Sequence, residues 1–205
     1  PRFNNHPDYV QAAVDAGIDV FSLANNHSFD YGPAGARATL ASLQELNRRA
    51  GRGGRAVASS GLRGTVDQPF EPAEIRVKGW RIGYLAVTQI SNEWVTEPLL
   101  AVVDYNNQAQ AARFLQDLSE ITPRFDLFVV SYHGDSEYVT EPAPAKKRFF
   151  HALLDAGVHI VHGHHPHILQ PCEVVDRAGG RRLILYSTGN FLAGQSVRAR
   201  PGDAD

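Results

Sequence analysis

Sulfur-containing residues are almost absent from the 205-residue sequence, which has one cysteine and no methionine. A single cysteine excludes an intramolecular disulfide and any cysteine-rich zinc module, and we expect Cys172 to be a small buried hydrophobic residue. Because no initiator methionine is present, we expect the start to be processed or to lie within a longer protein.

Long apolar runs and blocks of positive charge are also missing. No stretch reaches the ~18 apolar residues of a spanning helix, and the first residues resemble neither such a helix nor a signal peptide, so we expect no membrane segment in this chain. Twenty Lys and Arg residues stand against 22 Asp and Glu residues, giving a net charge of -2. Without a basic block to neutralise phosphates, nucleic-acid binding and a membrane-surface role find no support.

What remains is an ordinary globular composition, with 43% hydrophobic and 20% charged residues. This composition and length predict a single domain over residues 1–205. A chain of this size buries enough surface to fold without a structural metal. Any bound metal is therefore expected to serve chemistry.

Apolar periodicity alternates between helix and strand along the chain. Helices are predicted over residues 8–16, 33–49, 107–121 and 143–156. Strands are predicted over residues 18–23, 126–131 and 158–161, hairpins over residues 73–89 and 168–186, and residues 90–103 give no clear signal. This order indicates an α/β (α+β) fold of mixed sheets flanked by helices, in which ligands bind beyond the carboxyl ends of strands.

Three polar clusters occupy such positions. Asn25-Asn26-His27 follows the first predicted strand, His133 follows the strand at 126–131, and His164-His165-Pro166-His167 follows the strand at 158–161. The first and second clusters each follow a buried apolar run directly, where a rigid scaffold would hold the side chains in place. The clusters are therefore candidate site residues.

Histidine is concentrated in the third cluster, because residues 159–167 contain five of the nine histidines. Imidazole is the commonest metal ligand, and residues two apart in an extended segment point to the same side. His165 and His167 are thus expected to meet one metal centre, and His162 and His164 have the same spacing. The alternative is a polar turn whose imidazoles are solvated or bonded to the backbone.

The other two clusters are candidate site residues because all three clusters occur together. Alone, Asn-Asn-His is most often a turn and His133 a satisfied polar residue. An Asn carbonyl oxygen can nevertheless bind a divalent ion, and a neighbouring His can protonate a leaving oxygen. Asp30 and Glu137 are the nearest carboxylates, and each is a candidate to orient an imidazole, the alternative being a turn cap for Asp30 and a solvated side chain for Glu137.

Two other site types are not supported. Ser187 lacks the Gly-x-Ser-x-Gly surroundings of a nucleophile elbow, which argues against a serine hydrolase. The Gly- and Arg-rich stretch at residues 51–64 lacks both Gly-Lys-Ser/Thr and a dinucleotide fingerprint.

Four motifs in order carry a family resemblance. They are Leu23-Ala24-Asn25-Asn26-His27 with Asp30-Tyr31-Gly32, Ser131-Tyr132-His133 with Glu137-Tyr138, residues 163–171 (GHHPHILQP) with Glu173, and Tyr186-Ser187-Thr188-Gly189-Asn190-Phe191. Together they resemble the bacterial poly-γ-glutamate capsule-biosynthesis family of the CapA type, which is similar to the calcineurin-like metallophosphoesterases.

The resemblance implies a four-layer fold, a two-layer β-sandwich flanked by helices, whose loops hold two divalent ions of manganese, iron or zinc. It implies that metal is bound by Asn26, His133, His165 and His167. It implies that His27, with Asp30, contacts the substrate or protonates the leaving group. His164, Glu137 and Asn190 are further candidates for metal or substrate contacts, with the register of His164 against His165 and His167 open.

The chain departs from the family pattern in several places. Gly134-Asp135 stands where Trp-Gly is usual, and Thr188 stands where Leu is common, which affects the expected substrate contacts. A strand ending in Gly-Asp and an Asn-Leu-Glu motif would lie before Pro1. We therefore expect an incomplete N-terminal part, a missing Asp ligand, and weak metal binding and little activity in these 205 residues alone.

The function implied by the resemblance is a divalent-metal-dependent hydrolase of a phosphoester or related bond, serving capsule or surface-polymer production. The alternative is a non-catalytic subunit that binds anionic polymer, or assists a capsule synthase, through the same metal-lined cleft. A third is an amide-bond-processing enzyme. Membrane attachment, where the family has it, would precede Pro1, and the resemblance favours a place at the cell envelope.

Overall fold

The computed structural model describes residues 2–50, 57–64, 70–94 and 99–191. Its helices are α1 (Pro7–Asp15), α2 (Gly32–Ala50), α3 (Gln108–Ile121), the 3-10 turn η1 (Thr122–Arg124) and α4 (Pro144–Asp155). Its strands are β1 (Val20–Ser22), β2 (Ala58–Ser60), β3 (Ala73–Val77), β4 (Trp80–Thr88), β5 (Leu127–His133), β6 (Ile160–His164), β7 (Cys172–Arg177) and β8 (Gly180–Leu185). The predicted α/β alternation is confirmed.

The central feature is a six-stranded sheet in the order β3-β4-β5-β6-β8-β7. Strands β4, β5, β6 and β8 run parallel, and β3 and β7 pair antiparallel at the two edges. Thr88 of β4 is in register with His133 of β5, which is in register with His164 of β6. The carboxyl ends of these parallel strands therefore place two predicted site histidines side by side.

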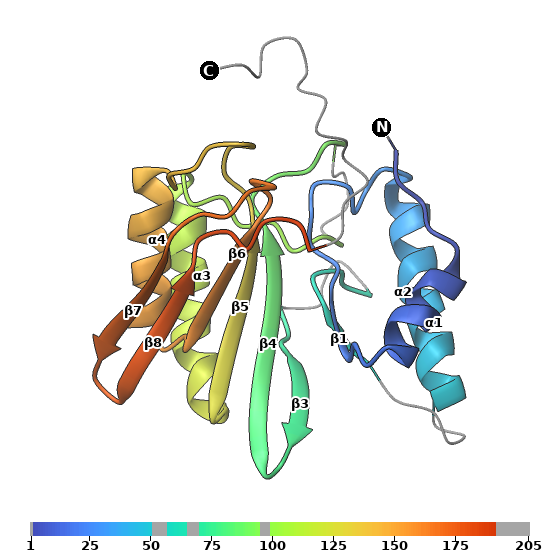
Figure 1. Cartoon of the computed structure of the whole chain (residues 1–205), viewed down its shortest axis with the longest axis horizontal. Helices are drawn as coiled ribbons and strands as arrows, with labels where there is room; N and C mark the ends of the chain where they lie inside the picture. The colour runs from blue at the N-terminus through green and yellow to red at the C-terminus, as the bar shows by residue number, and fades with distance from the viewer. Residues whose placement is uncertain (1, 51–56, 65–69, 95–98, 192–205) are drawn as a thin grey trace.

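One face of this sheet packs on α3 and α4 (Figure 1). Alternate residues of β5, including Phe128 and Tyr132, point to that face and are fully buried. The Tyr132 ring lies 5.5 Å from the ring of Phe149 and 5.3 Å from that of Phe150, both on α4. This aromatic cluster anchors the strand that ends in His133.

The other face meets a smaller layer near β4. Strands β1 and β2 form a parallel two-stranded sheet, and Ser60 Oγ accepts a hydrogen bond of 3.1 Å from the Ala86 backbone N–H of β4. Ala24 and Ala86 share a small core between the sheets, while Val14 of α1 and Leu43 of α2 cover the outer side (Figure 1). The predicted order of helices, two sheets and helices is thus present.

Local differences from the predictions have physical causes. Strand β2 was not expected, because its sequence Ala-Ser-Ser follows a Gly- and Arg-rich stretch and lacks apolar alternation. Cys172 is exposed, not buried, because it begins the edge strand β7. Strand β6 extends to His164, so His162 and His164 lie within a strand. Within the described residues, every helix is too short or too polar to cross a bilayer.

Candidate metal centre

The predicted site residues meet at the carboxyl edge of the sheet. Asn26 and His27 lie in the loop after β1, His133 and His164 end β5 and β6, and His167 lies in the loop after β6. They border an open cleft of about 400 Å³. Its lining consists of Phe3, Ser22, Asn25, Asn26, His27, His133, His164 and His167.

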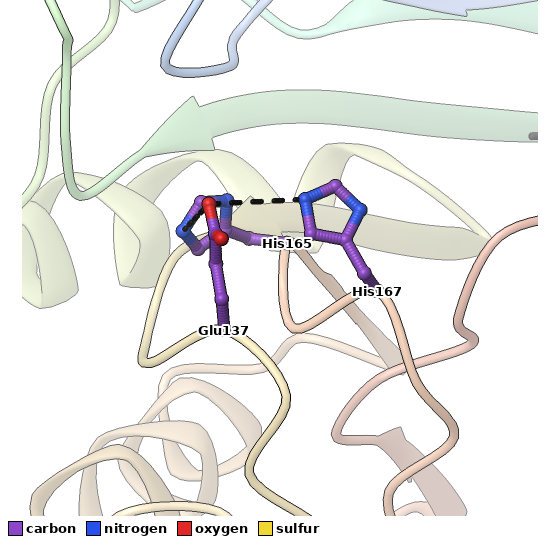
Figure 2. Close-up of side chains that lie close together, drawn as sticks. All are labelled: Glu137, His165 and His167. Carbon is purple, nitrogen blue, oxygen red and sulfur yellow. Dashed lines mark ion pairs between the residues drawn. The ribbon is translucent and has the colours of Figure 1, made fainter. Parts of the chain in front are cut away.

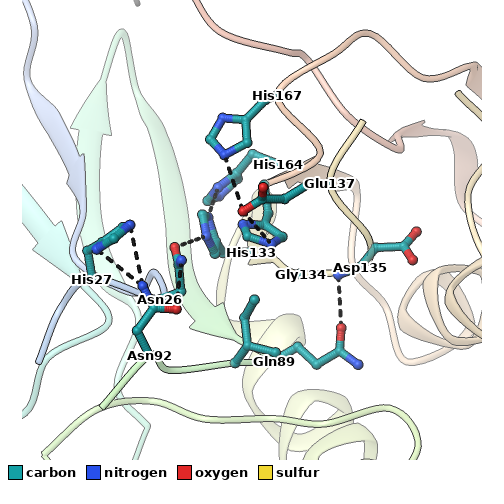
Figure 3. Close-up of polar contacts among 12 residues, drawn as sticks. Asn26, His27, Gln89, Asn92, His133, Gly134, Asp135, Glu137, His164 and His167 are labelled. Atoms are coloured by element: carbon teal, nitrogen blue, oxygen red, sulfur yellow. Dashed lines mark hydrogen bonds and ion pairs between the residues drawn. The ribbon is translucent and has the colours of Figure 1, made fainter. Parts of the chain in front are cut away.

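A continuous hydrogen-bonded chain crosses the floor of the cleft (Figure 3). His133 Nε2 lies 2.9 Å from Asn26 Oδ1, and its Nδ1 lies 2.7 Å from His164 Nδ1. His164 Nε2 lies 2.8 Å from Ser131 Oγ. Because an amide oxygen only accepts, His133 carries its proton on Nε2, His164 donates from Nδ1, and the Ser131 hydroxyl donates to His164 Nε2.

The imidazoles of His133 and His164 are both neutral. Burial lowers the pKa of His133 and of His164 well below the usual 6.5, and neighbouring imidazoles lower it further. Neutral imidazole is the form that binds metal ions. For His133 Nε2 to bind one, the His133 proton would move to Nδ1 and the His164 proton to Nε2, where Ser131 Oγ would accept it.

A second pair, His27 and Asp30, lies on the other side of the cleft. His27 Nδ1 lies 2.8 Å from Asp30 Oδ2, and the Asp30 side chain is buried. The same Asp30 oxygen accepts a 2.8 Å hydrogen bond from the Phe3 backbone N–H, and the Phe3 ring stands edge-on to His27 at 4.5 Å. This arrangement fixes the orientation of the His27 imidazole.

Asn92 joins the two sides of the site. Its Oδ1 accepts a 3.1 Å hydrogen bond from Asn26 Nδ2, and its amide nitrogen lies 3.3 Å from His27 Nδ1. Asn92 and Ser131 were not predicted. Asn92 follows the carboxyl end of β4. A polar residue in that position is the same sequence signal that indicated His133.

A third group of side chains contains Glu137, His165 and His167 (Figure 2). Glu137 Oε1 lies 3.9 Å from Nε2 of each histidine. The His165 ring also lies 4.7 Å from the ring of His133. Asn190 Oδ1 lies 3.0 Å from His167 Nδ1, so this candidate residue orients an imidazole. His162 instead reaches Thr188 Oγ1 at 3.0 Å.

This donor set suits divalent transition metals. Imidazole nitrogen with carboxylate and amide oxygen is the chemistry of zinc, iron and manganese sites. His165 is buried, and its Nδ1 has no hydrogen-bond partner among the described residues. A buried polar atom without a partner is costly, and a bound cation nearby would compensate for it.

Comparison with known proteins places these motifs in a family. Residues 1–195 match the family described as "Bacterial capsule synthesis protein PGA_cap". The chain belongs to this family. The family assignment associates the chain with capsule biosynthesis and confirms the resemblance carried by the four motifs.

Individual relatives cover most of the chain. "Capsule biosynthesis protein CapA" of Bacillus anthracis is 29% identical over 91% of this chain and 43% of its own length. "PGA biosynthesis protein CapA" of Bacillus subtilis is 29% identical over 95% and 47%. A "Probable polyglutamine synthesis accessory protein" of Mycobacterium tuberculosis is 28% identical over 93% and 49%. The chain thus spans about half the length of the curated relatives it matches.

Proposed function

We propose that this chain forms the active-site region of a divalent-metal-dependent hydrolase that cleaves a phosphoester or related bond during capsule-polymer production. The observation that carries the proposal is the position of the His27–Asp30 pair at a cleft lined by imidazole and amide side chains, which are suited to bind metal. A proton donor next to a cation site is the arrangement that ester hydrolysis needs.

Each residue has a role in this proposal. Asn26, His133, His165 and His167 would hold divalent metal, which supplies Lewis-acid polarisation of the substrate oxygen. His27 would give a proton to the leaving oxygen, and Asp30 would hold the His27 ring and stabilise its protonated form. Asn92 would keep the amide of Asn26 and the ring of His27 in register.

Electrostatics favours an anionic substrate bound through metal. The described residues that line the cleft include no Lys or Arg. Phosphate or carboxylate groups of a polymer would therefore meet their positive charge in bound cations. This makes substrate binding itself depend on metal.

The alternative is a non-catalytic subunit that binds anionic polymer through the same metal-lined cleft. The word "accessory" in the name of the mycobacterial relative favours this reading. A polymer-binding subunit needs the metal ligands but does not need an oriented proton donor. His27 is therefore essential to the hydrolase and dispensable to the polymer-binding subunit.

Metal-dependent turnover tests the proposed function. The purified full-length natural protein would be stripped with a chelator and assayed with bis(p-nitrophenyl) phosphate before and after adding manganese. We expect hydrolysis to vanish on stripping and to return with manganese. Metal-dependent binding of polyglutamate without turnover of any phosphoester would support the non-catalytic alternative.

A further inference from the structure

We propose that the Glu137 carboxylate is a direct ligand of the divalent cation that His165 and His167 hold. The cation would be a transition metal that accepts two imidazole nitrogens and one carboxylate oxygen. This inference deepens the proposed function and rests on it only in requiring divalent metal to enter the cleft. The family resemblance left Glu137 as a candidate for either a metal or a substrate contact.

The geometry is close to that of a bound site. One donor atom from each of the three residues lies within 4.8 Å of the other two. Ligand atoms of a tetrahedral site with bonds of about 2.1 Å are about 3.4 Å apart. The Glu137 oxygen lies 3.9 Å from both imidazole nitrogens. Binding would draw the Glu137 oxygen, on a side chain that is 44% exposed, about 0.5 Å closer to each nitrogen, and would draw together donor atoms that now lie up to 4.8 Å apart.

The hydrogen bonds leave the right atoms available. The Asn190 oxygen can only accept, so His167 donates from Nδ1 and its Nε2 presents a lone pair toward Glu137. At 3.9 Å, the Glu137 oxygen is too far from either Nε2 for a hydrogen bond. A cation between the three side chains would bind Nε2 of His165, Nε2 of His167 and the Glu137 oxygen across these gaps.

The backbone of the two histidines is strained in a way that serves the site. His165 has φ of 105° and His167 has φ of 63°, in the left-handed region that side chains other than glycine rarely adopt. Such strain persists only where the surroundings impose it, and it concentrates at functional sites. Here it turns both imidazoles toward Glu137 from a segment of three residues.

A buried lysine holds together the two loops that supply the ligands. Lys146 is fully buried, and its Nζ lies 3.2 Å from Gln170 Oε1 and 3.5 Å from Asp135 Oδ2. Gln170 Nε2 donates to the Val139 carbonyl at 2.8 Å, and the Tyr138 backbone N–H donates to Pro166 O at 2.9 Å. The loop that carries Glu137 is thus fastened to the loop that carries both histidines.

Cobalt binding tests the site without relying on turnover. The metal-free protein would be titrated with Co²⁺ and followed by visible absorption, with bound cobalt counted by elemental analysis. We expect Glu137→Gln to weaken one cobalt equivalent more than about 100-fold, beyond the roughly 10- to 100-fold cost of losing a group that only supports a ligand, and to change the visible spectrum of that cobalt. Glu141→Gln is the matched control, because Glu141 is an exposed carboxylate on the same loop that pairs with Lys147.

The outcomes separate this inference from the proposed function. Unchanged cobalt affinity in Glu137→Gln would overturn the site even if the protein hydrolyses phosphoesters. An equal loss in Glu137→Gln and Glu141→Gln would overturn it as well, because the effect would then be one of net charge. Loss confined to Glu137→Gln supports the site whether or not any ester is cleaved.

Discussion

Replacing His27 by alanine removes the proposed proton donor and leaves the proposed metal ligands in place. The His27 side chain is about a quarter exposed, and its ring contacts Asp30, Asn92 and Phe3 but none of the proposed metal ligands through a hydrogen bond. A positioned general acid contributes about 10²- to 10⁴-fold to a rate. The expected rise in activation free energy is therefore about 3–5 kcal/mol.

The size of that loss depends on the leaving group, which gives the assay its power. p-Nitrophenolate leaves readily without being protonated, whereas the more basic phenolate depends more strongly on protonation as it leaves. Hydrolysis of bis(p-nitrophenyl) phosphate and of diphenyl phosphate would be compared in the wild type, in His27→Ala and in the exposed control His6→Ala. We expect His27→Ala to lose far more activity toward diphenyl phosphate than toward bis(p-nitrophenyl) phosphate, and to keep its bound metal. The control His6→Ala should keep wild-type activity on both substrates. Equal losses on both substrates, or a loss of metal, would refute the role of His27.

Three further predictions concern His133, the pH dependence of stability, and Gly163. His133→Ala should reduce both bound metal, measured by elemental analysis, and turnover, because its imidazole is a proposed ligand; retention of full metal content would contradict that role. Folded metal-free protein should lose stability on acidification, because burial lowers the pKa of His133 and His164 below the unfolded value of 6.5. Stability is complete above that pH and falls below it, by about 2.7 kcal/mol per pH unit for the two groups together. Urea unfolding at several pH values measures this, and a flat profile would count against it. Gly163→Ala should destabilise the fold strongly, because its Cβ would lie 2.1 Å from the Tyr186 carbonyl oxygen of the neighbouring chain segment; a thermal melt equal to wild type would show that the strands can separate there.

The sequence predicted the scaffold well where apolar patterning was strong. Strand β5 alternates buried residues toward one face and ends in His133, so both its existence and its polar end were readable. Strand β2 was missed because Ala58–Ser60 is held by pairing with β1, a contact between residues distant in sequence that no local pattern reports.

The sequence indicated which histidines lie near one another but not the contacts that join them to other residues. The spacing of His165 and His167 indicated a shared centre, but only the fold shows Glu137 at equal distances from both. Asn92 escaped notice because its partner Asn26 lies 66 residues away in the chain. The bond between His133 and His164 likewise depends on strand register, which sequence does not specify.

The central claim is that the cleft at the carboxyl edge of the sheet is a metal centre, and anomalous X-ray diffraction from crystals grown with manganese tests it most directly. We expect one anomalous peak within about 2–3 Å of donor atoms of Glu137, His165 and His167, and density for metal beside Asn26 and His133. Manganese peaks only at surface carboxylates elsewhere, with these side chains bonded to one another or to water, would show that the cleft is not a metal centre.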